Sequence, residues 1–234
     1  MGNRRNSLLV GAVIVVSATL GCGGSSSNSG GSATASLRIV LMNPSTGTVN
    51  VMVGGNTVAN GLPYLGNTGY FSVKAGSETV AIPNQTAPID GAMLNLASGS
   101  QSTFFDDGWG HFEASWTILT DDNTPSPTSA KLRIMNGAVE GAGDFYLLPA
   151  GSTPSGAPLA PILAFNHATS YQVLAPGAYE VFVTLSQTPT QILFDSGLIT
   201  LAAGQNRTMV VLSNCQPTSC GFNDFISITL ADMN

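Results

Sequence analysis

The feature that most constrains this fold is a set of short stretches in which apolar residues alternate with other residues. Three of them span residues 49–53, 78–82 and 179–183, and glycine-containing turns such as Gly54-Gly55-Asn56 separate them. A period of two is typical of strands with one buried face, and no stretch beyond residue 21 shows a convincing apolar period of 3.6. The pattern therefore predicts an all-β chain of short antiparallel strands.

Four short motifs occur twice in the same order, with a spacing between copies that only grows along the chain. The paired motifs are Leu37-Arg38-Ile39 with Leu132-Arg133-Ile134, Tyr70-x5-Gly76-x3-Val80 with Tyr171-x5-Gly177-x3-Val181, Leu96-Ala97-x-Gly99-x3-Thr103 with Leu201-Ala202-x-Gly204-x3-Thr208, and Leu119-x-Asp121-x-Asn123 with Leu230-x-Asp232-x-Asn234. Extra residues of the second copy fall in turn-rich stretches such as 149–156, where surface loops tolerate insertions. The repeat predicts two tandem antiparallel β-sandwich domains of immunoglobulin-like or transthyretin-like type, at residues 36–123 and 131–234, joined by a Pro/Ser linker at 124–130.

The composition excludes several classes of protein. Charged residues are 9% of the 234 positions, against roughly 25% in an average soluble chain. The formal net charge of −6 excludes a basic nucleic-acid binder, because phosphate binding needs clustered Lys and Arg. With 43% hydrophobic residues, the chain is also too apolar to be an acidic disordered protein. The composition and net charge do not indicate a binding partner.

The N-terminus has the pattern of an export signal. A basic start at Arg4-Arg5 precedes an apolar run from Leu8 to Leu20, which is shorter than the roughly 20 residues of a membrane span. The run ends in Ala18-Thr19-Leu20-Gly21-Cys22, which resembles the lipobox of bacterial lipoproteins, where a small residue precedes a cysteine that receives diacylglycerol. We expect residues 1–21 to be a lipoprotein signal peptide and Cys22 to be the lipid attachment site; the alternative is ordinary secretion with an incidental Cys22.

A Gly/Ser-rich tract follows at residues 22–35 and shows no apolar periodicity. Such a tract behaves as a flexible coil, so we expect it to tether the folded part of the chain to the acylated cysteine. Acyl chains contribute about 0.8 kcal/mol per buried CH₂ and would hold the protein at a membrane. The expected location is the bacterial cell envelope, outside the cytoplasm, with a lipid anchor in the outer membrane or at the cell surface.

Two cysteines remain once Cys22 is assigned to lipid. Cys215 and Cys220 are close in sequence, and in an oxidising compartment a disulfide is the default interpretation. A redox pair and half of a metal site are the alternatives, but a metal site needs about four ligands and no histidine lies nearby. We expect a local disulfide, no metal and no other cofactor.

Candidate catalytic residues are few. His111 follows the carboxylates Asp106 and Asp107 and has the chemistry of a general base or metal ligand, but we expect this stretch to be a surface connection. His167 is a single histidine in a turn, and the stretch 121–123 is similar to a calcium loop without its acidic spacing, so strand-end capping is expected there. Since no hydrolase, zinc-protease or nucleotide motif is present, we expect no enzymatic activity; a cryptic hydrolase is the third hypothesis.

Aromatic side chains raise one binding alternative. Trp109 lies in a Gly-rich turn, where we expect its ring to be exposed, whereas Trp116 is expected to fill the core from a late strand. Exposed rings can stack on sugars, so Trp109 is the candidate ligand-stacking residue. A carbohydrate-binding surface module that uses exposed aromatics is therefore the alternative function.

The strand and turn residues carry a family resemblance. An opening LRI, a V-x-V-x-V-G-G hairpin, GY-x-x-V-x-AG-x-x-x-V and a final L-x-L-A-x-G-x-x-x-T resemble domain-of-unknown-function family 4397. The resemblance implies tandem domains of bacterial cell-surface or exported proteins over nearly all of residues 36–234, and its motifs say nothing about chemistry. The first copy departs from the pattern at Glu78, where the second copy has Tyr179.

Together these observations favour a non-enzymatic cell-envelope lipoprotein that displays two β-sandwich domains for binding, adhesion or envelope architecture. The expected partners are the membrane, through the lipid anchor, and an envelope protein or a glycan. Nucleic acid is not expected as a partner.

Overall fold

The computed structural model describes residues 32–43, 47–85, 88–107, 114–138, 143–216 and 219–233, without the side chains of 215–224. Ser32–Asn234 forms one compact unit. Every regular element of the described part is a β-strand, which confirms the all-β prediction. In that part of the chain, no helix is long and apolar enough to cross a membrane. Cys22 and the rest of the predicted signal and tether up to residue 31 lie outside the described residues.

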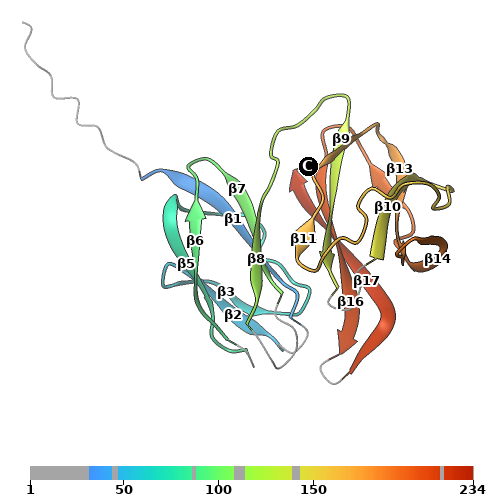
Figure 1. Ribbon diagram of the computed structural model, residues 1–234. Coiled ribbons are helices and arrows are strands. Elements are labelled where there is room, and N and C mark those ends of the chain that lie inside the picture. The colour runs from blue at the N-terminus through green and yellow to red at the C-terminus, as the bar shows by residue number, and fades with distance from the viewer. Residues whose placement is uncertain are drawn as a thin grey trace, which may run out of the picture. The chain divides into compact units, whose positions relative to one another are not determined.

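The first eight strands form two sheets (Figure 1). Their bounds are β1 (Thr34–Leu41), β2 (Val49–Val53), β3 (Asn56–Leu62), β4 (Phe71–Lys74), β5 (Gly76–Ile82), β6 (Ile89–Leu96), β7 (Gln101–Asp106) and β8 (Trp116–Thr120). The outer first sheet has the strand order β3-β2-β5-β6, and the inner first sheet has the order β4-β1-β7-β8. Alternate residues of these strands face the space between the two sheets.

The remaining strands form two further sheets. Their bounds are β9 (Ala130–Gly137), β10 (Gly143–Pro149), β11 (His167–Ala168), β12 (Gln172–Leu174), β13 (Gly177–Leu185), β14 (Thr188–Asp195), β15 (Ile199–Leu201), β16 (Asn206–Gln216) and β17 (Ser219–Met233). The inner second sheet has the order β11-β9-β16-β17, with β12 also on β9, and the outer second sheet has the order β10-β13-β14, with β15 also on β13.

Each inner sheet contains one parallel pair of strands. β1 pairs with β7 in parallel, and β9 pairs with β16 in parallel, whereas the other strand pairs of the described residues are antiparallel. The prediction of antiparallel strands alone is therefore corrected at these two places. Apolar alternation reports which face of a strand is buried and carries no information about the direction of its neighbour.

Two apolar clusters fill the spaces between outer and inner sheets. In the first half, Leu37 and Ile39 of β1 pack with residues of the outer first sheet such as Val51. In the second half, Leu132 and Ile134 of β9 lie in the equivalent cluster, together with residues of the outer second sheet. Each pair of sheets thus has the packed interior of a β-sandwich.

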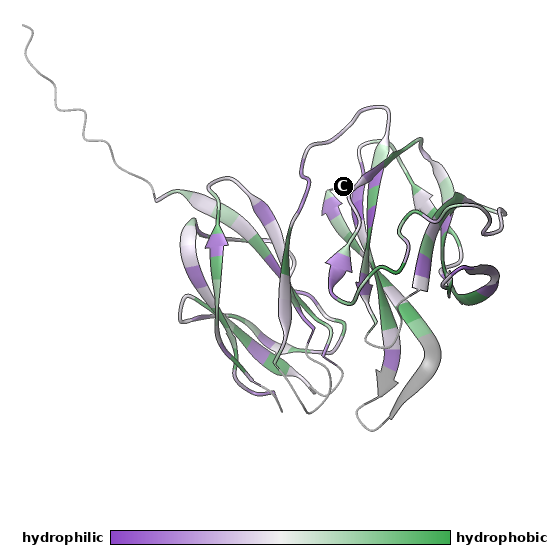
Figure 2. Cartoon of the chain, in the orientation of Figure 1, coloured by the Kyte–Doolittle hydropathy of each residue, from purple (hydrophilic) through white to green (hydrophobic). Residues whose placement is uncertain are grey.

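A third apolar cluster lies between the two inner sheets. Val40 and Phe105 of the inner first sheet pack against Met135, Val210 and Leu212 of the inner second sheet. β1 and β9 are therefore buried on both faces, although their sequences mix apolar residues with polar and charged ones (Figure 2). The described strands form four layers in the order outer first, inner first, inner second and outer second sheet (Figure 1).

Candidate functional site

The structure does not bring the predicted catalytic candidates together. His111 and Trp109 lie outside the described residues. His167 begins β11 with an exposed side chain, and its Nδ1 lies 2.9 Å from the carbonyl oxygen of Phe165. Within the described ranges, no group of three or more His, Cys, Asp or Glu is placed to hold a metal ion.

Two expectations about single residues need correction. Trp116 was expected inside the core, but its side chain on edge strand β8 is 38% exposed and stacks on buried Phe104, with ring centroids 5.5 Å apart. Asp106 and Asp107 were expected in a surface connection, yet they are 0% and 3% exposed. Burial raises the pKa of Asp107, while the nearby side chain of Ser115 and other polar groups oppose the shift.

A buried polar cluster lies between the two inner sheets and includes Arg38 of β1. Arg38 is 3% exposed and donates from Nε and Nη2 to Oγ1 of Thr103, at 3.0 and 2.7 Å. It also donates from Nη2 to Oδ1 of Asp232 at 2.6 Å and from Nη1 to the carbonyl oxygen of Ala231 at 2.8 Å. The centroid of the Tyr70 ring lies 4.4 Å from the guanidinium carbon. Four neighbours thus hold this cation between the sheets.

Arg133 of β9 makes equivalent contacts, and the carboxylate and the carbonyl oxygen that it binds belong to the first half of the chain. Its Nε donates to Oγ1 of Thr208 at 2.8 Å, and its Nη1 donates to the carbonyl oxygen of Thr120 at 2.8 Å. Its Nη2 donates to the carboxylate of Asp121. The ring of Tyr171 lies over the guanidinium, with its centroid 4.8 Å away.

Each carboxylate also accepts hydrogen bonds from its own half of the chain. Asp121 accepts from Thr103 at 2.6 Å and from Tyr70 at 2.7 Å. Asp232 accepts from Thr208 at 2.5 Å and from Tyr171 at 2.9 Å. We call these eight side chains the arginine–aspartate cluster, and its members are Arg38, Tyr70, Thr103, Asp121, Arg133, Tyr171, Thr208 and Asp232.

Every member of the arginine–aspartate cluster comes from one of the four motifs that occur twice in the sequence. Each arginine pairs with the aspartate of the opposite half, in the reciprocal manner of a two-fold interface. The strand-end capping interpretation of Asp121 is therefore wrong: this carboxylate is buried and ion-paired. The repeat in the sequence picked out these eight positions. No pattern in the sequence indicated that their side chains contact one another.

Burial shifts the pKa of three groups in this cluster. It raises the pKa of Tyr70 and Tyr171 above the ordinary value of 10.0, and the nearby carboxylate of Asp121 adds to the effect at Tyr70. Burial also raises the pKa of Asp121, while the guanidinium of Arg133 opposes that shift. The two phenols are therefore held as hydrogen-bond donors to the carboxylates.

Stability should consequently fall at alkaline pH. The folded chain retains both phenolic protons where the unfolded chain releases them, so the free energy of unfolding is expected to decrease as the pH rises above about 10. The double variant Tyr70→Phe/Tyr171→Phe should show a weaker decrease. Urea unfolding between about pH 7 and about pH 11 measures this, with Tyr179→Phe as the control outside the cluster. Equal pH dependence in the wild type and the double variant would contradict the prediction.

The predicted disulfide lies near the tip of the hairpin of β16 and β17. The backbone register makes Cys215 the partner of Cys220. Residues directly opposite in antiparallel strands have Cα atoms about 4.5–5.5 Å apart, within the range that a disulfide spans. The two side chains lie outside the described residues, so the bond stays a prediction.

Reduction of this bond is expected to have a small effect on stability. The loop that it closes is short, so its chain-entropy contribution is about 2 kcal/mol at most. Thermal unfolding with and without a reductant should differ only slightly, and the double variant Cys215→Ser/Cys220→Ser should unfold like the reduced protein. A count of two free thiols in the exported protein would refute the bond.

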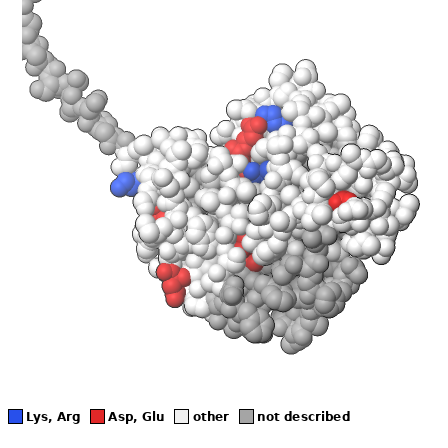
Figure 3. Space-filling model, viewed as in Figure 1, with Lys and Arg blue, Asp and Glu red and all other residues white. Residues whose placement is uncertain are grey.

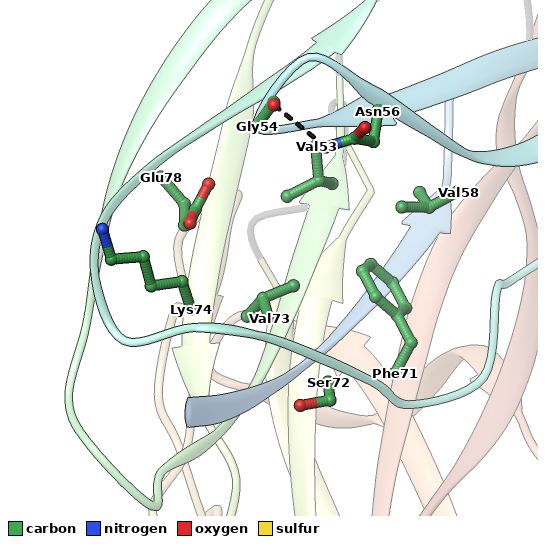
Figure 4. A pocket seen from close by; sticks show the side chains of 9 residues that line it. All are labelled: Val53, Gly54, Asn56, Val58, Phe71, Ser72, Val73, Lys74 and Glu78. Carbon is green, nitrogen blue, oxygen red and sulfur yellow. Dashed lines mark hydrogen bonds between the residues drawn. The ribbon is translucent and has the colours of Figure 1, made fainter. Parts of the chain in front are cut away.

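A pocket opens between the edges of the first two sheets (Figure 4). It has a volume of about 280 Å³ and is bordered by β3, an edge strand of the outer first sheet, and β4, an edge strand of the inner first sheet. Val53, Val58 and Phe71 form its apolar part, and Lys74 and Glu78 lie at one end of it (Figure 4). We call this the edge pocket.

The shape of the edge pocket depends on a glycine turn. Gly54 has φ of 55°, and a Cβ there would lie 2.6 Å from Oε2 of Glu78. The Nδ2 of Asn56 donates to the carbonyl oxygen of Gly54 at 3.2 Å and closes the turn. The V-x-V-x-V-G-G pattern therefore forms a tight turn at the end of the edge pocket, with the carboxylate of Glu78 close to it.

Charges are sparse on the surface seen in Figure 3, where small acidic and basic groups lie among uncharged residues. The sequence as a whole has 7 Lys and Arg against 13 Asp and Glu. This face shows no basic area of the kind that binds phosphate backbones.

Comparison with known proteins finds a family model that matches part of the chain. Residues 35–146 match the model of DUF4397, a domain of unknown function. The match runs from β1 into β10, and it agrees with the resemblance seen in the motifs of the first copy. No curated protein matches the chain.

Solved structures give only distant likenesses. The TIE protein of Bacillus anthracis is 10% identical, with a TM-score of 0.24, and the match covers 77% of this chain but 33% of that one. A family CBM26 module of Eubacterium rectale Amy13K, solved with maltoheptaose, is 9% identical with a TM-score of 0.26, covering 82% of this chain and 96% of that one. A leucine-rich repeat protein from Bacteroides thetaiotaomicron is 13% identical with a TM-score of 0.19, covering 79% and 26%. The chain spans about a third of the TIE protein, and scores this low support no argument about ligand or activity.

Proposed function

We propose that this protein is a non-enzymatic lipoprotein of the bacterial cell envelope, which displays two tandem β-sandwich units and binds an extended polypeptide segment of a partner envelope protein. The observation that carries the binding role is the edge pocket. It places an apolar depression directly between the edges of two sheets.

The chemistry of the two edges favours an extended peptide. β3 pairs only with β2 and β4 only with β1 among the described strands, so each edge offers backbone N–H and C=O groups to another strand. A peptide that adds to such an edge gains main-chain hydrogen bonds, and a pocket for an alternate side chain adds specificity. Val58 and Phe71 provide that apolar contact.

The tandem organisation is supported by the reciprocal contacts of the arginine–aspartate cluster. Equivalent residues of the four recurring motifs make equivalent hydrogen bonds in both halves. The envelope location is supported by the export pattern that ends at Cys22. Mass spectrometry of the mature N-terminus tests it: a diacylglyceryl-modified Cys22 is expected, and an unmodified Cys22 would count against anchoring.

Selection from a random displayed peptide library against the full chain tests the binding role. We expect enriched peptides with apolar side chains at alternate positions. Val58→Lys should weaken their binding at least tenfold, because it places a charge in the apolar part of the edge pocket. Met93→Lys, at a side chain that is 68% exposed on β6, is the matched control and should bind like the wild type. No enrichment, or equal binding to Val58→Lys, would refute the proposal.

A carbohydrate-binding surface module remains the second candidate, and one observation favours it. The ring of Trp116 is 38% exposed at an edge strand, as a sugar-stacking ring would be. A glycan array with wild type, Trp109→Ala and Trp116→Ala decides between the candidates. Sugar binding that is lost in either variant would favour this function over the peptide-binding one, and absence of sugar binding would eliminate it.

A further inference from the structure

The outer face of the outer second sheet is covered, unlike the matching face in the first half. Along β10, Phe145 points into the sandwich core, so Asp144 and Tyr146 point to the opposite face. Both are nevertheless buried, at 5% and 2% exposure. In the first half, the outward residues of β2, Asn50 and Met52, are only half-buried. A further segment must therefore lie over this face of β10.

That segment is the chain between β10 and β11, which includes the turn-rich stretch expected to be a tolerated surface insertion. The hydroxyl of Tyr146 donates to the carbonyl oxygen of Gly156 at 3.3 Å. The backbone N–H of Ile162 donates to Oδ1 of Asp144 at 3.0 Å, and that of Gln187 donates to Oδ2 at 2.8 Å. One buried carboxylate thus accepts hydrogen bonds from two loops, and the first of these also pairs with the edge of β10 through Ala160 and Phe145.

Both loop residues have a backbone conformation that L side chains rarely adopt. Ile162 has φ of 46° and Gln187 has φ of 61°. In the first half the corresponding donor is Gly61, with φ of 65°, whose N–H donates to Oδ1 of Asn50 at 3.1 Å. A β-branched residue at positive φ is strained, and such strain is characteristic of ligand-binding positions. Ile162 is also 54% exposed, so burial of its own side chain does not explain its presence there.

The two loops border a second pocket of about 300 Å³ that is open to solvent on one side, which we call the covered pocket. Its walls include Tyr146, Pro158, Pro161 and Ile162, and Asp144 contributes to its lining. No lysine or arginine is among the residues that line it. Among the described residues, Asp144 has no ion-pair partner.

A second polar group lies beside this carboxylate. Thr184 is the cross-strand partner of Asp144, so both side chains lie on the same face of the sheet. Thr184 is fully buried, and its Oγ1 has no hydrogen-bond partner among the described residues. The covered pocket therefore combines apolar walls with a buried carboxylate that has no counter-charge among the described residues, and the hydroxyl of Thr184 lies beside that carboxylate on the same face of the sheet.

The geometry points to a binding site for a primary ammonium group on a short apolar stem, such as a lysine side chain or a free alkyl diamine, in the covered pocket. Two backbone N–H groups already donate to the carboxylate of Asp144, but its buried charge has no cation beside it among the described residues, and an ammonium supplies that charge together with three donors. The proline, isoleucine and tyrosine walls suit the methylene stem of such a ligand. An anionic ligand is disfavoured because the lining contains no cation. This site does not depend on peptide binding at the edge pocket.

NMR titration of the full chain with pentylamine, 1-pentanol and pentanoate tests the site. Pentylamine is expected to shift the backbone amide signals of Ile162 and Gln187 in a saturable way, because both amides bond to the carboxylate that it would contact. The alcohol and the acid, which have the same stem, should bind at least tenfold more weakly. Pentylamine that binds no better than 1-pentanol, or that leaves these amides unmoved, would overturn the proposal.

Two variants complete the test. Asp144→Asn keeps the shape of the side chain and should weaken pentylamine binding at least tenfold. Asn50→Asp places a carboxylate at the corresponding position of the first half, where the outward residues of β2 are only half-buried, and should create no second site. Should Asp144→Asn fail to fold by circular dichroism, the wild-type comparison of amine with alcohol decides alone. Cadaverine and Nα-acetyl-lysine amide then distinguish a free diamine from a lysine side chain: binding of either supports the site, and binding of neither refutes it.

Discussion

Replacing Asp232 with alanine is expected to lower the free energy of unfolding by about 3–5 kcal/mol. Asp232 is 3% exposed and lies 2.6 Å from Nη2 of Arg38, which is 194 positions away in the sequence. Its removal leaves a guanidinium buried between two sheets without a counter-charge, and it also leaves the hydroxyls of Thr208 and Tyr171 without their acceptor. The cost of the unpaired cation exceeds that of a single lost hydrogen bond. Urea unfolding of the wild type and the variant measures the difference.

The same substitution should also destabilise the opposite half of the chain. Both tryptophans, Trp109 and Trp116, belong to the first half, whereas Asp232 belongs to the second. Tryptophan fluorescence and far-UV circular dichroism should therefore shift together in the Asp232→Ala variant. A fluorescence transition that stays where the wild type has it would contradict the reciprocal pairing.

A partly exposed ion pair provides the control. Lys131 and Asp122 lie 2.5 Å apart, with side chains that are 16% and 28% exposed. Asp122→Ala should cost about 1 kcal/mol or less, because solvent screens this pair. An apolar double replacement, Arg38→Met with Asp232→Leu, should recover much of the stability lost in Asp232→Ala, since it leaves no buried charge unpaired.

Replacing Phe105 with alanine is expected to cost about 3–5 kcal/mol as well. Phe105 is fully buried in the apolar cluster between the two inner sheets, where Met135 and Val210 of the opposite half contact the same cluster. Truncation to alanine removes the buried ring and leaves a cavity that the packed strands can fill only in part. Thermal or urea unfolding gives the size of the effect.

Hydrogen exchange can show that this cost is shared across the interface. In the Phe105→Ala variant, amides of β16 should exchange faster, as should those of β7, because the lost ring supports both inner sheets. Met93→Ala, at a side chain that is 68% exposed, should change stability by about 0.5 kcal/mol or less. A cost below about 1 kcal/mol for Phe105→Ala, or exchange that rises only in the first half, would show that the inner sheets do not depend on each other.

Sequence reasoning predicted the strands better than the candidate site. The stretches 49–53, 78–82 and 179–183 all lie in strands, β2, β5 and β13, because alternation and glycine turns act over a few neighbouring residues. The edge pocket was not predicted, although its glycine turn was noticed. A pocket between two sheet edges depends on how far apart those edges lie, and no local pattern reports that distance.

In the second copy, the local sequence pattern likewise did not predict which residues a distant segment buries. The stretch 149–156 was expected to be a surface loop, and its composition is typical of one. In the structure the segment that contains it covers Asp144 and Tyr146. Strand alternation places both residues on an outward face, and only the path of the following loop buries them.

Local patterns in the amino-acid order were enough to establish an all-β chain, the positions of several of its turns and the four motifs that occur twice, whereas the turn expected at Asn60-Gly61 lies inside β3. Those properties depend on side-chain periodicity and backbone preferences over a few residues. The pairing of Arg38 with Asp232 and of Arg133 with Asp121 came from the three-dimensional arrangement alone. A polar residue at an alternate strand position is expected to face water, and it becomes a buried ion-pair partner only when a second sheet packs over that face and brings the opposite charge to it.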